Sequence, residues 1–574
     1  MSEVAGLSAS ESAKGWRRPW AAATALVKGR LWLAATVPVV AILATAVVYP
    51  LVRVAVTSFA SPTWGFSNYA AFLATPTYVN ILWRTFLTAA EVTGICFVLA
   101  YPYAYLMTRV GRRLRPLLLM AVLVPLFTSA VVRTFAWFVL LSPTGPVIGV
   151  LGHVKIGQLF ADGTLGAVIV GMVQVLLPIT ILPLYACMVN IGEAQLVAAE
   201  SLGAKPWRAF IRVYWPQTVP GVLGAGVLVF VSSLGFYLVP QLLGSPQQEL
   251  IPQLLYDQIM NLLNYGMGDA AACITAVIGL VVVGLAFWAG AGTARGGYET
   301  VVVGVERNRG GRRRPYRLGL LLFGIGVAGF LVLPSLVNLP LSFTGSQSFV
   351  FPPHSWSVRW YENLFTSTEW QGSLLASFEV ALASAAVATV AGTMAALVVV
   401  RSRSRWARRV QTFVLLPQVL PGVILALAIY VVFLDWGISG TVPGFVLAHA
   451  ALGVPLVVIV SVAGFGRFEE RLDHAAAGLG AGPMSRALRI WVPLLAPTVI
   501  AGAVLACVTS LDEFMVSFFL QGPNLVTLPV RMFSSIQDQI DPTVAAAGCV
   551  MLVVAAALVG LALWAGSRSQ RSAA

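Results

Sequence analysis

Two short stretches of this chain decide its architecture, Ala198-Ala199-Glu200-Ser201-Leu202-Gly203-Ala204-Lys205-Pro206 and Ala475-Ala476-Ala477-Gly478-Leu479-Gly480-Ala481-Gly482-Pro483. In both, alanines that favour a helix are followed by a glycine, which permits a tight turn, and by a proline, which can begin a second helix. We therefore predict a compact helix-turn-helix at each place. Leu479 follows Leu202 by 277 residues. Because the same pattern occurs twice, we predict that one domain has been duplicated.

The repeat extends well beyond these two loops. The spacing of 277 residues also pairs Arg212 with Arg489, Pro216 with Pro493, Ser233-Leu234 with Ser510-Leu511, and Pro252 with Pro529. Nearer the N-terminus a spacing of 292 residues pairs Trp64 with Trp356, Tyr69 with Tyr361, Arg109 with Arg401, and Pro125 with Pro417. The change of spacing predicts an additional segment in the first half, near Pro143, Pro146 and Gly149.

The composition excludes an ordinary soluble protein. The 574 residues are 58% hydrophobic and 10% charged, whereas soluble domains are about 25% charged. Apolar runs long enough to cross a bilayer, about 18 residues or more, indicate an all-α membrane protein with six transmembrane helices in each half. The twelve predicted spans are 31–56, 81–107, 116–141, 165–189, 218–240, 268–292, 316–342, 373–400, 410–436, 442–465, 497–520 and 543–566. Because six is even, the halves are parallel repeats.

The net charge of +14 reports orientation and does not indicate a nucleic-acid partner. Most Lys and Arg residues fall in alternate loops and in both tails, which predicts that both termini and the central linker are cytoplasmic. The basic linker should lie near lipid headgroups of the bilayer. We predict an N-terminal tail at 1–30, a first permease-like domain at 31–292, a linker at 293–315, a second domain at 316–566 and a tail at 567–574.

Enzymatic chemistry finds no support in the sequence. A nucleotide-binding P-loop needs Gly-Lys followed by Ser or Thr, and none of the lysines, Lys14, Lys28, Lys155 and Lys205, follows a glycine. The five cysteines lie in apolar runs and the four histidines are scattered, so no metal-ligand spacing is present. We therefore expect no catalytic residue, no metal and no cofactor in this chain.

The duplicated loops resemble the EAA motif of the membrane permeases of ABC-type importers, and the resemblance covers about 31 to 566. It implies two type I importer permease domains. It further implies two copies of an ATP-binding subunit that uses ATP and Mg on the cytoplasmic face, a solute-binding protein on the other face, and a bacterial cytoplasmic (inner) membrane. The coupling residues implied are Ala198, Ala199, Glu200, Gly203, Ala204, Ala475, Ala476, Gly480 and Ala481. The leading Glu of the motif is replaced by Val197 and His474.

Among importers, the chain looks like the spermidine/putrescine permeases, with both permease halves fused. The resemblance rests on Trp64 with Tyr69, Trp356 with Tyr361, the segment Ser510-Leu511-Asp512-Glu513-Phe514 and the segment Thr527-Leu528-Pro529. It implies polyamine transport by alternating access. Iron(III) complexes, opines, aminoethylphosphonate and thiamine-like compounds remain alternatives.

Acidic residues at membrane depth are costly and mark pathways or buried pairs. Asp512 and Glu513 correspond to Gly235 and Phe236 in the first half. We predict an asymmetric pathway in which carboxylates neutralise ammonium groups and aromatic faces bind cations. Its predicted residues are Phe236, Tyr237, Asp512, Glu513 and Phe514. Two alternatives stay open: Asp512 could pair with Arg133 or Arg84, and Phe236 and Tyr237 could be packing residues. For His449 we predict an interhelical hydrogen bond.

A secondary transporter of the major facilitator type is the competing interpretation. Twelve spans, a central linker and the basic turn Arg109-Val110-Gly111-Arg112-Arg113 resemble that class. However, Thr108 stands where that class has an Asp, and the duplicated loops have no explanation there. A channel is less favoured, because no selectivity-filter segment is evident.

Overall fold

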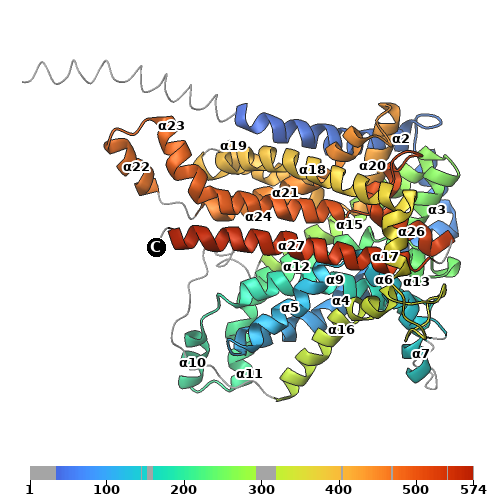
Figure 1. The fold of residues 1–574 in the computed structure, drawn as a ribbon, viewed down its shortest axis with the longest axis horizontal. Coiled ribbons are helices and arrows are strands. Elements are labelled where there is room, and N and C mark those ends of the chain that lie inside the picture. The colour runs from blue at the N-terminus through green and yellow to red at the C-terminus, as the bar shows by residue number, and fades with distance from the viewer. Residues whose placement is uncertain are drawn as a thin grey trace, which may run out of the picture.

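The computed structural model describes residues 34–143, 145–151, 159–291, 318–402, 405–466, 470–538 and 541–572. These residues form long helices that run side by side, with short helices at both ends of the bundle (Figure 1). The predicted tail at 1–30 and linker at 293–315 lie outside the described residues, as do the last two residues of the predicted tail at 567–574. The all-α membrane fold predicted from composition is confirmed, with eleven described helices long and apolar enough to cross a membrane.

The long helices repeat in the same order in both halves. In the first half they are the stretch Ala34–Ala60, which contains α2 (Tyr49–Ala60), then α4 (Pro76–Arg109), α9 (Leu165–Met188), α12 (Trp215–Leu234) and α15 (Tyr265–Ala291). In the second half they are α16 (Leu318–Ser342), α18 (Thr368–Arg401), α21 (Val442–Phe465), α24 (Val492–Leu511) and α27 (Thr543–Ser572).

The third span of each half is broken, which differs from the continuous spans predicted at 116–141 and 410–436. In the first half α5 (Leu114–Phe127) is followed by α6 (Ala130–Leu141), and the intervening Thr128 and Ser129 have extended ψ angles of 132° and 137°. In the second half α19 (Arg405–Val414) and a short turn precede α20 (Gly422–Asp435). Prolines near both breaks account for them, because proline lacks the N–H that continues a helix.

The fifth spans, predicted as 218–240 and 497–520, are also interrupted. α12 ends at Leu234 and α13 (Leu238–Leu243) follows, while α24 ends at Leu511 and α25 (Met515–Leu520) follows. In each half three residues separate the two helices, 235–237 in the first half and 512–514 in the second. All five predicted pathway residues lie in these two short segments. Non-helical backbone at membrane depth is tolerated where protein or a cavity surrounds it.

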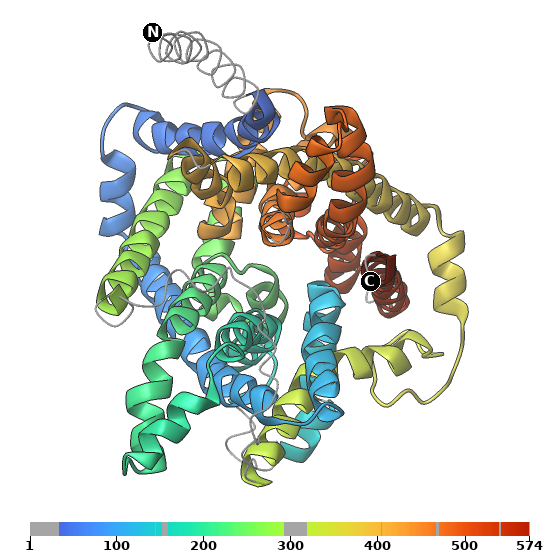
Figure 2. The same ribbon diagram turned by 90° about the vertical axis from the view of Figure 1, so that its left-hand side faces the viewer.

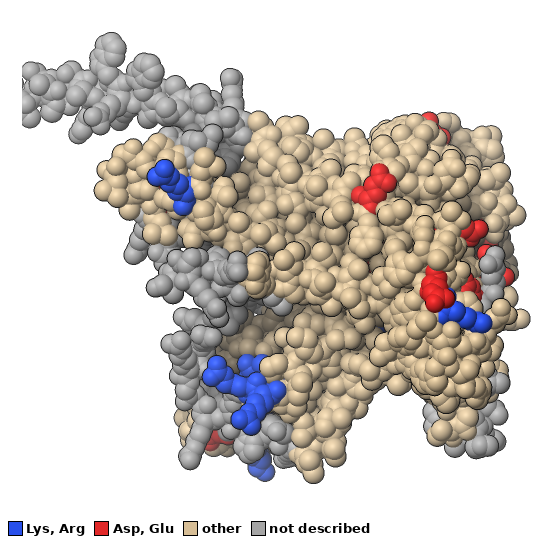
Figure 3. Space-filling view, in the orientation of Figure 1, with Lys and Arg blue, Asp and Glu red and all other residues tan. Residues whose placement is uncertain are grey.

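Charge separates the two ends of the bundle. Lys and Arg gather at the end that carries α10 (Glu193–Ser201), α11 (Pro206–Ala209), α22 (Glu470–Gly478) and α23 (Pro483–Arg486). Asp and Glu gather toward the opposite end, and an uncharged belt lies between them (Figure 3). We call the end that carries α10, α11, α22 and α23 the elbow end. The opposite end holds α3 (Ser67–Ala74), α7 (Pro146–Leu151), α14 (Ile251–Tyr256), α17 (Arg359–Thr366) and α26 (Leu528–Asp538).

The first span of each half packs on the other half (Figure 2). α2 lies against α20, where Tyr49 stacks on Trp436 with ring centroids 5.5 Å apart. α16 lies against α5 and α6, and the Gln174 side chain of α9 donates a hydrogen bond of 2.9 Å to the carbonyl of Leu331. The first span of each half therefore packs against the third span of the other half.

Residues that match between the halves make equivalent contacts. The Tyr69 hydroxyl lies 2.8 Å from the Ser58 hydroxyl, and the Tyr361 hydroxyl lies 2.9 Å from that of Ser342. Each pair fastens a helix of the opposite end to the first span of its own half. The repeat read from the sequence therefore extends to side-chain contacts.

A second equivalent contact explains the prolines Pro252 and Pro529. The Thr85 hydroxyl accepts the N–H of Ile251 at 2.9 Å, and the Ser377 hydroxyl accepts the N–H of Leu528 at 2.7 Å. In each half a hydroxyl of the second span thus satisfies the first N–H of a helix whose next residue is proline. The four N–H groups that begin a helix have no partner within the helix, so such an acceptor stabilises them.

Candidate functional site

The two duplicated loops form the helix-turn-helix units that the sequence predicts, and we call them the first and second elbow. α10 and α11 make the first elbow, and α22 and α23 make the second. Gly203 and Gly480 hold the turns with φ of +88° and +83°, a left-handed conformation that favours glycine. The preceding Leu202 and Leu479 are each 89% exposed. Both elbows protrude from the same end of the bundle (Figure 1).

The predicted coupling residues all lie on these elbows. Ala198, Gly203, Ala475 and Gly480 are exposed, whereas Ala199, Glu200, Ala204, Ala476 and Ala481 are half-buried. Val197 and His474, which replace the leading Glu of the motif, are both exposed. Two apolar tips with small residues around them form a surface that can enter grooves on another protein.

The elbows are fastened to the bundle by different chemistry. In the second elbow the Asp473 carboxylate accepts hydrogen bonds from Arg486 at 3.1 Å and from the Trp491 indole at 2.8 Å. At the corresponding positions the first elbow has Leu196, Ala209 and Tyr214, and all three are buried. Buried, uncharged side chains therefore stand where the second elbow has a charged clamp.

The break after α24 meets the break before α6 of the other half. The Asp512 carboxylate accepts the backbone N–H of Ala130 at 3.1 Å, and Arg133, one turn further along α6, attracts it electrostatically. A carboxylate at a helix N-terminus also interacts favourably with the helix dipole. Of the alternatives left open by the sequence, the structure thus places Asp512 beside Arg133.

Arg84 has a separate role at the opposite end. Its guanidinium donates to the carbonyls of Gln247 at 2.5 Å and Glu249 at 3.3 Å, which holds this loop against α4. Burial raises the pKa of the Glu249 carboxyl, the nearby Asp257 raises it further, and Arg84 opposes both effects.

The equivalent break in the first half has no room for a side chain. A Cβ on Gly235 would lie 2.5 Å from the backbone N of Gly422 and 3.0 Å from the carbonyl carbon of Pro421. Gly235 corresponds to Asp512, and Pro421-Gly422 corresponds to Ser129-Ala130. We call these two places, where the break of one half meets the helix start of the other, the Asp512 crossing and the Gly235 crossing.

Glu513 turns away from the crossing toward a narrow cavity between α21 and α24, which has no room for a water molecule in this conformation. One of its oxygens accepts the Val516 N–H at 2.9 Å, which caps α25. The cavity is also lined by His449, Thr509 and Ser510, together with Leu452, Gly453 and Ala506. A carboxylate beside two hydroxyls is a suitable partner for a cationic or hydrogen-bond-donating group.

A network of hydroxyl groups holds one wall of this cavity. His449 is buried, and its two ring nitrogens lie 2.7 Å from the Ser510 hydroxyl and 3.1 Å from the Ser517 hydroxyl. Ser384 donates a further hydrogen bond of 3.0 Å to Ser510. The interhelical hydrogen bond predicted for His449 is confirmed. The network was not predicted from the sequence, although the repeat aligns His449 with Met172 of the first half and so marks a polar residue present in one half only.

Tyr237 and Phe514 belong to an aromatic cluster with Tyr256, Phe518 and Phe533. Ring centroids lie 5.5 Å apart for Tyr237 and Phe518, 5.3 Å for Tyr256 and Phe518, and 4.9 Å for Phe514 and Phe533. The cluster joins the two halves beyond the breaks, at the side away from the elbows. Tyr237 and Phe514 are buried, whereas Phe236 is half-buried, and their contact with a solute stays a prediction.

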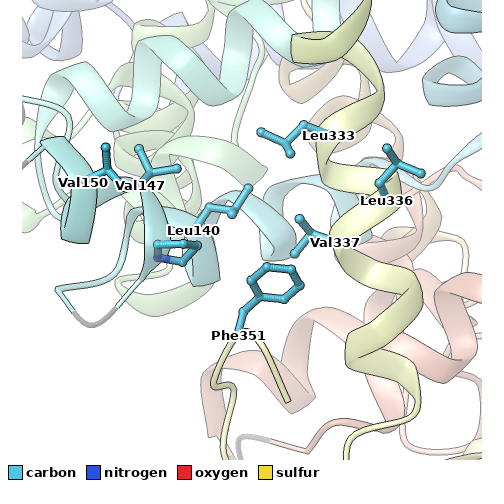
Figure 4. Close-up of a pocket in the computed structure, with 8 residues that line it drawn as sticks. Leu140, Val147, Val150, Leu333, Leu336, Val337 and Phe351 are labelled. Atoms are coloured by element: carbon cyan, nitrogen blue, oxygen red, sulfur yellow. The ribbon is translucent and has the colours of Figure 1, made fainter. Parts of the chain in front are cut away.

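A second cavity has a different character. It measures about 570 Å³ and is lined by apolar side chains of α6, α7 and α16 and by Phe351 (Figure 4). Such a lining offers no partner to a charged solute. Among the described residues, no group of three or more His, Cys, Asp or Glu could hold a metal ion.

Comparison with known proteins agrees with this duplicated arrangement. Residues 94–293 and 388–570 match the family of binding-protein-dependent transport system inner membrane components. The spermidine/putrescine transport system permease protein PotB of Salmonella typhimurium is 32% identical over 238 residues, which cover 40% of this chain and 80% of that protein. The putrescine transport system permease protein PotI of Escherichia coli K12 is 30% identical over 259 residues, which cover 44% and 90%.

Two solved structures of a bacterial ABC transporter that imports alginate are also similar. One covers 49% of this chain and 98% of its own at 18% identity, with a TM-score of 0.33. The other, in complex with an alginate pentasaccharide-bound periplasmic protein, covers 48% and 94% at 18% identity, with a TM-score of 0.34. The two family matches decide against the major facilitator alternative. This chain belongs to the binding-protein-dependent transport system inner membrane components, the permeases of ABC importers, and carries one copy of the family domain in each half.

Proposed function

We propose that this chain forms the complete translocation pathway of an ATP-driven importer of polyamines, powered by two copies of a separate ATP-binding subunit. The two elbows carry this proposal. They present Leu202 and Leu479 at equal exposure, 89% each, at one end of the bundle. Two equivalent apolar tips suit two copies of one partner, whose movement on ATP binding would move the halves relative to each other.

The charge distribution supports a cytoplasmic elbow end. Basic residues gather there and acidic residues gather at the opposite end (Figure 3), as the positive-inside rule expects for a cytoplasmic and an external face. A solute-binding protein would then dock at the opposite end. In this arrangement both termini and the linker are cytoplasmic.

The substrate proposal rests on Glu513 together with the relatives. PotB and PotI are named for spermidine and putrescine, which carry ammonium groups at neutral pH. Glu513 faces a cavity with Thr509 and Ser510, whereas Asp512 is engaged by α6. Glu513 is therefore the carboxylate that would meet an ammonium group once movement of α21 and α24 opens this cavity. Aminoethylphosphonate, whose phosphonate makes its net charge negative, would be disfavoured there.

Affinity purification of the tagged chain tests the partner. Native mass spectrometry of the complex should show two ATP-binding subunits for each chain, and ATPase activity should co-purify. Gly203→Trp together with Gly480→Trp should abolish recovery of these subunits while the chain stays monodisperse. Gly372→Trp, at an open position on α18 near the opposite end, should leave recovery unchanged. Purification of a lone chain that takes up solute without ATP would contradict the proposal.

Uptake into proteoliposomes tests the substrate. With the ATP-binding subunit and the binding protein supplied, ATP-dependent uptake of labelled spermidine or putrescine is expected, and aminoethylphosphonate should not compete. Glu513→Gln should lower polyamine uptake at least about tenfold, which corresponds to about 1.4 kcal/mol in the transition state, with unchanged complex assembly. Equal uptake by the variant, or transport of the anion alone, would overturn the polyamine assignment.

A further inference from the structure

Arg53 on α2 connects the two halves through a loose ion pair. Its Nη2 lies 3.6 Å from Oδ2 of Asp435, the last residue of α20, and the two side chains are 41% and 55% exposed. Its Nη1 donates a hydrogen bond of 2.7 Å to the Thr57 hydroxyl. Tyr49 stacks on Trp436 between the same two helices. An exposed pair of this length is held weakly, so Arg53 can leave Asp435 without a large penalty.

α2 packs on α15 of its own half, where Cys273 Sγ lies 3.8 Å from the Ser58 hydroxyl, and one turn before Cys273 on α15 is a second carboxylate, Asp269. Asp269 on α15 is fully buried, at 0% exposure, and neither of its carboxyl oxygens has a hydrogen-bond partner among the described residues. Arg53 acts on it electrostatically. The other polar groups near it are Tyr69 and Cys273, which direct their hydrogen bonds to Ser58. A buried carboxyl group without a partner is strongly disfavoured in its charged form, so an approaching guanidinium would stabilise the charged Asp269.

The second half shows that the fold does not require this carboxylate. Ala546 stands at the position that corresponds to Asp269. At the neighbouring residue, the Asn338 amide donates a hydrogen bond of 3.1 Å to the Ala545 carbonyl. The contact at this place in the second half is therefore made by uncharged groups. Only the first half bears the unfavourable free energy of burying this carboxyl group. Because Arg53 on the adjacent helix contacts the other half, we look for its function in movement between the halves.

We propose that Arg53 is a switch residue that exchanges Asp435 of the other half for Asp269 of its own half as the two halves separate at the end opposite the elbows. In the conformation described here the cross-half pair is formed and Asp269 waits unpaired. When α20 moves away from α2, Arg53 loses Asp435 and turns to Asp269. The exchange keeps the guanidinium paired in both conformations and so lowers the cost of the movement. This proposal rests on the alternating access included in the proposed function.

The exchange predicts opposite effects for two isosteric substitutions. Asp435→Asn weakens the conformation with the halves together, and Asp269→Asn weakens the one with the halves apart. Because an equilibrium shifts by the differential stabilisation of its two states, the two variants should move the population in opposite directions. A purely structural role for either residue would destabilise the protein without such an opposition.

Distances between the halves test this in the full chain bound to its ATP-binding subunit in nanodiscs. Spin-label amino acids at the exposed Leu262 and Val358 leave the native cysteines in place. Asp435→Asn should raise the long-distance population about fivefold or more, and Asp269→Asn should lower it by a similar factor. Glu369→Gln, which removes the Glu369–Arg531 pair inside the second half, should change nothing. Shifts in the same direction, or none, would overturn the switch.

Arg53→Gln gives the decisive second measurement. In that background both substitutions should lose their effect on the distances, because the exchanged group is gone. Persistence of either effect would show that the carboxylates act without Arg53. The distance readout needs no transported solute. If the two variants shift the distances in opposite directions but the protein takes up no polyamine, only the substrate proposal fails. If the protein takes up polyamine but the two variants show no opposite shifts, only the switch proposal fails.

Discussion

The Asp512 crossing and the Gly235 crossing have the same place in the duplicated fold and solve the same contact differently. At the Asp512 crossing the break after α24 meets the start of α6. At the Gly235 crossing the break after α12 meets the start of α20. At one crossing a carboxylate accepts the Ala130 N–H at 3.1 Å, with Arg133 nearby. At the other, the backbone of Gly235 packs directly on Pro421 and Gly422. At equivalent positions of the repeat, one contact between the halves is thus made by close backbone packing and the other by a charged helix cap.

The duplicated backbone is thus the same at both crossings, while the residues that make the contact differ. Small residues allow close approach of membrane helices, and polar residues join them through hydrogen bonds. The elbows repeat this lesson, since Asp473 binds Arg486 and Trp491 where the first elbow has buried apolar residues. The Glu513 cavity can therefore be confined to one half without a change of architecture.

The largest effect is expected from removing the carboxylate of the Asp512 crossing. Asp512→Ala should lower the free energy of unfolding by about 1.5–3 kcal/mol, because it removes the acceptor of the Ala130 N–H and a charge that attracts the buried Arg133. The measurement is the temperature at which half of the detergent-solubilised protein stays monodisperse. Adding Arg133→Leu, which copies Leu425 of the other half, should restore part of the loss. An equally unstable double variant would show that the pair does not matter.

The Gly235 crossing should be sensitive to a single added carbon. Gly235→Ala should cost about 1–3 kcal/mol, the range for overpacking, because the new Cβ would meet the backbone of Gly422 at 2.5 Å. The same thermal assay applies. Gly224→Ala on the preceding helix α12, where the added carbon would meet nothing within 4 Å, is the control. Equal midpoints for the two variants would mean that the crossing has space.

Where the halves share the same contact, their sensitivity should be equal. Thr85→Val and Ser377→Ala each remove the hydroxyl that accepts the first N–H of α14 or α26. Each should cost about 0.5–2 kcal/mol, as for other lost helix caps. Thermal midpoints of both single variants check the expectation. A large effect in one half only would show that these joints have diverged as the crossings have.

The smallest effects should come from the two tyrosines at the opposite end. Tyr69→Phe and Tyr361→Phe each remove one hydrogen bond, to Ser58 or Ser342, and should cost about 0.5–1.5 kcal/mol. Hydrogen exchange of the first span in each half, followed by mass spectrometry, detects losses of this size. Similar loss of protection in α2 and α16 is expected. Unequal loss would locate a further asymmetry.

Much of the fold could be predicted because it rests on local patterns. The spans follow from continuous apolar runs, and the elbows follow from alanine, glycine and proline at fixed spacing. The breaks at Thr128-Ser129 and before Gly422 were not predicted, since proline is tolerated in many membrane helices and its effect depends on neighbours. The insertion predicted near Pro146 was located correctly, between α6 and α9, where α7 lies.

The candidate site divides along the same line. Asp512 and Glu513 were recognised by their charge at membrane depth. The structure alone placed Asp512 on α6 and Glu513 beside Thr509 and Ser510. It also brought Tyr237 and Phe514 into one aromatic cluster, which no spacing in the sequence indicates.

Hydrophobicity, charge bias and repeat spacing are properties of contiguous stretches, so the amino-acid sequence is sufficient to predict a duplicated, twelve-span permease with two elbows. The sequence does not indicate which break meets which helix start, which first span packs on which half, or that Arg53 pairs with Asp435 of the other half. Those contacts join residues hundreds of positions apart. Their geometry depends on the packing of whole helices, and no local pattern records it.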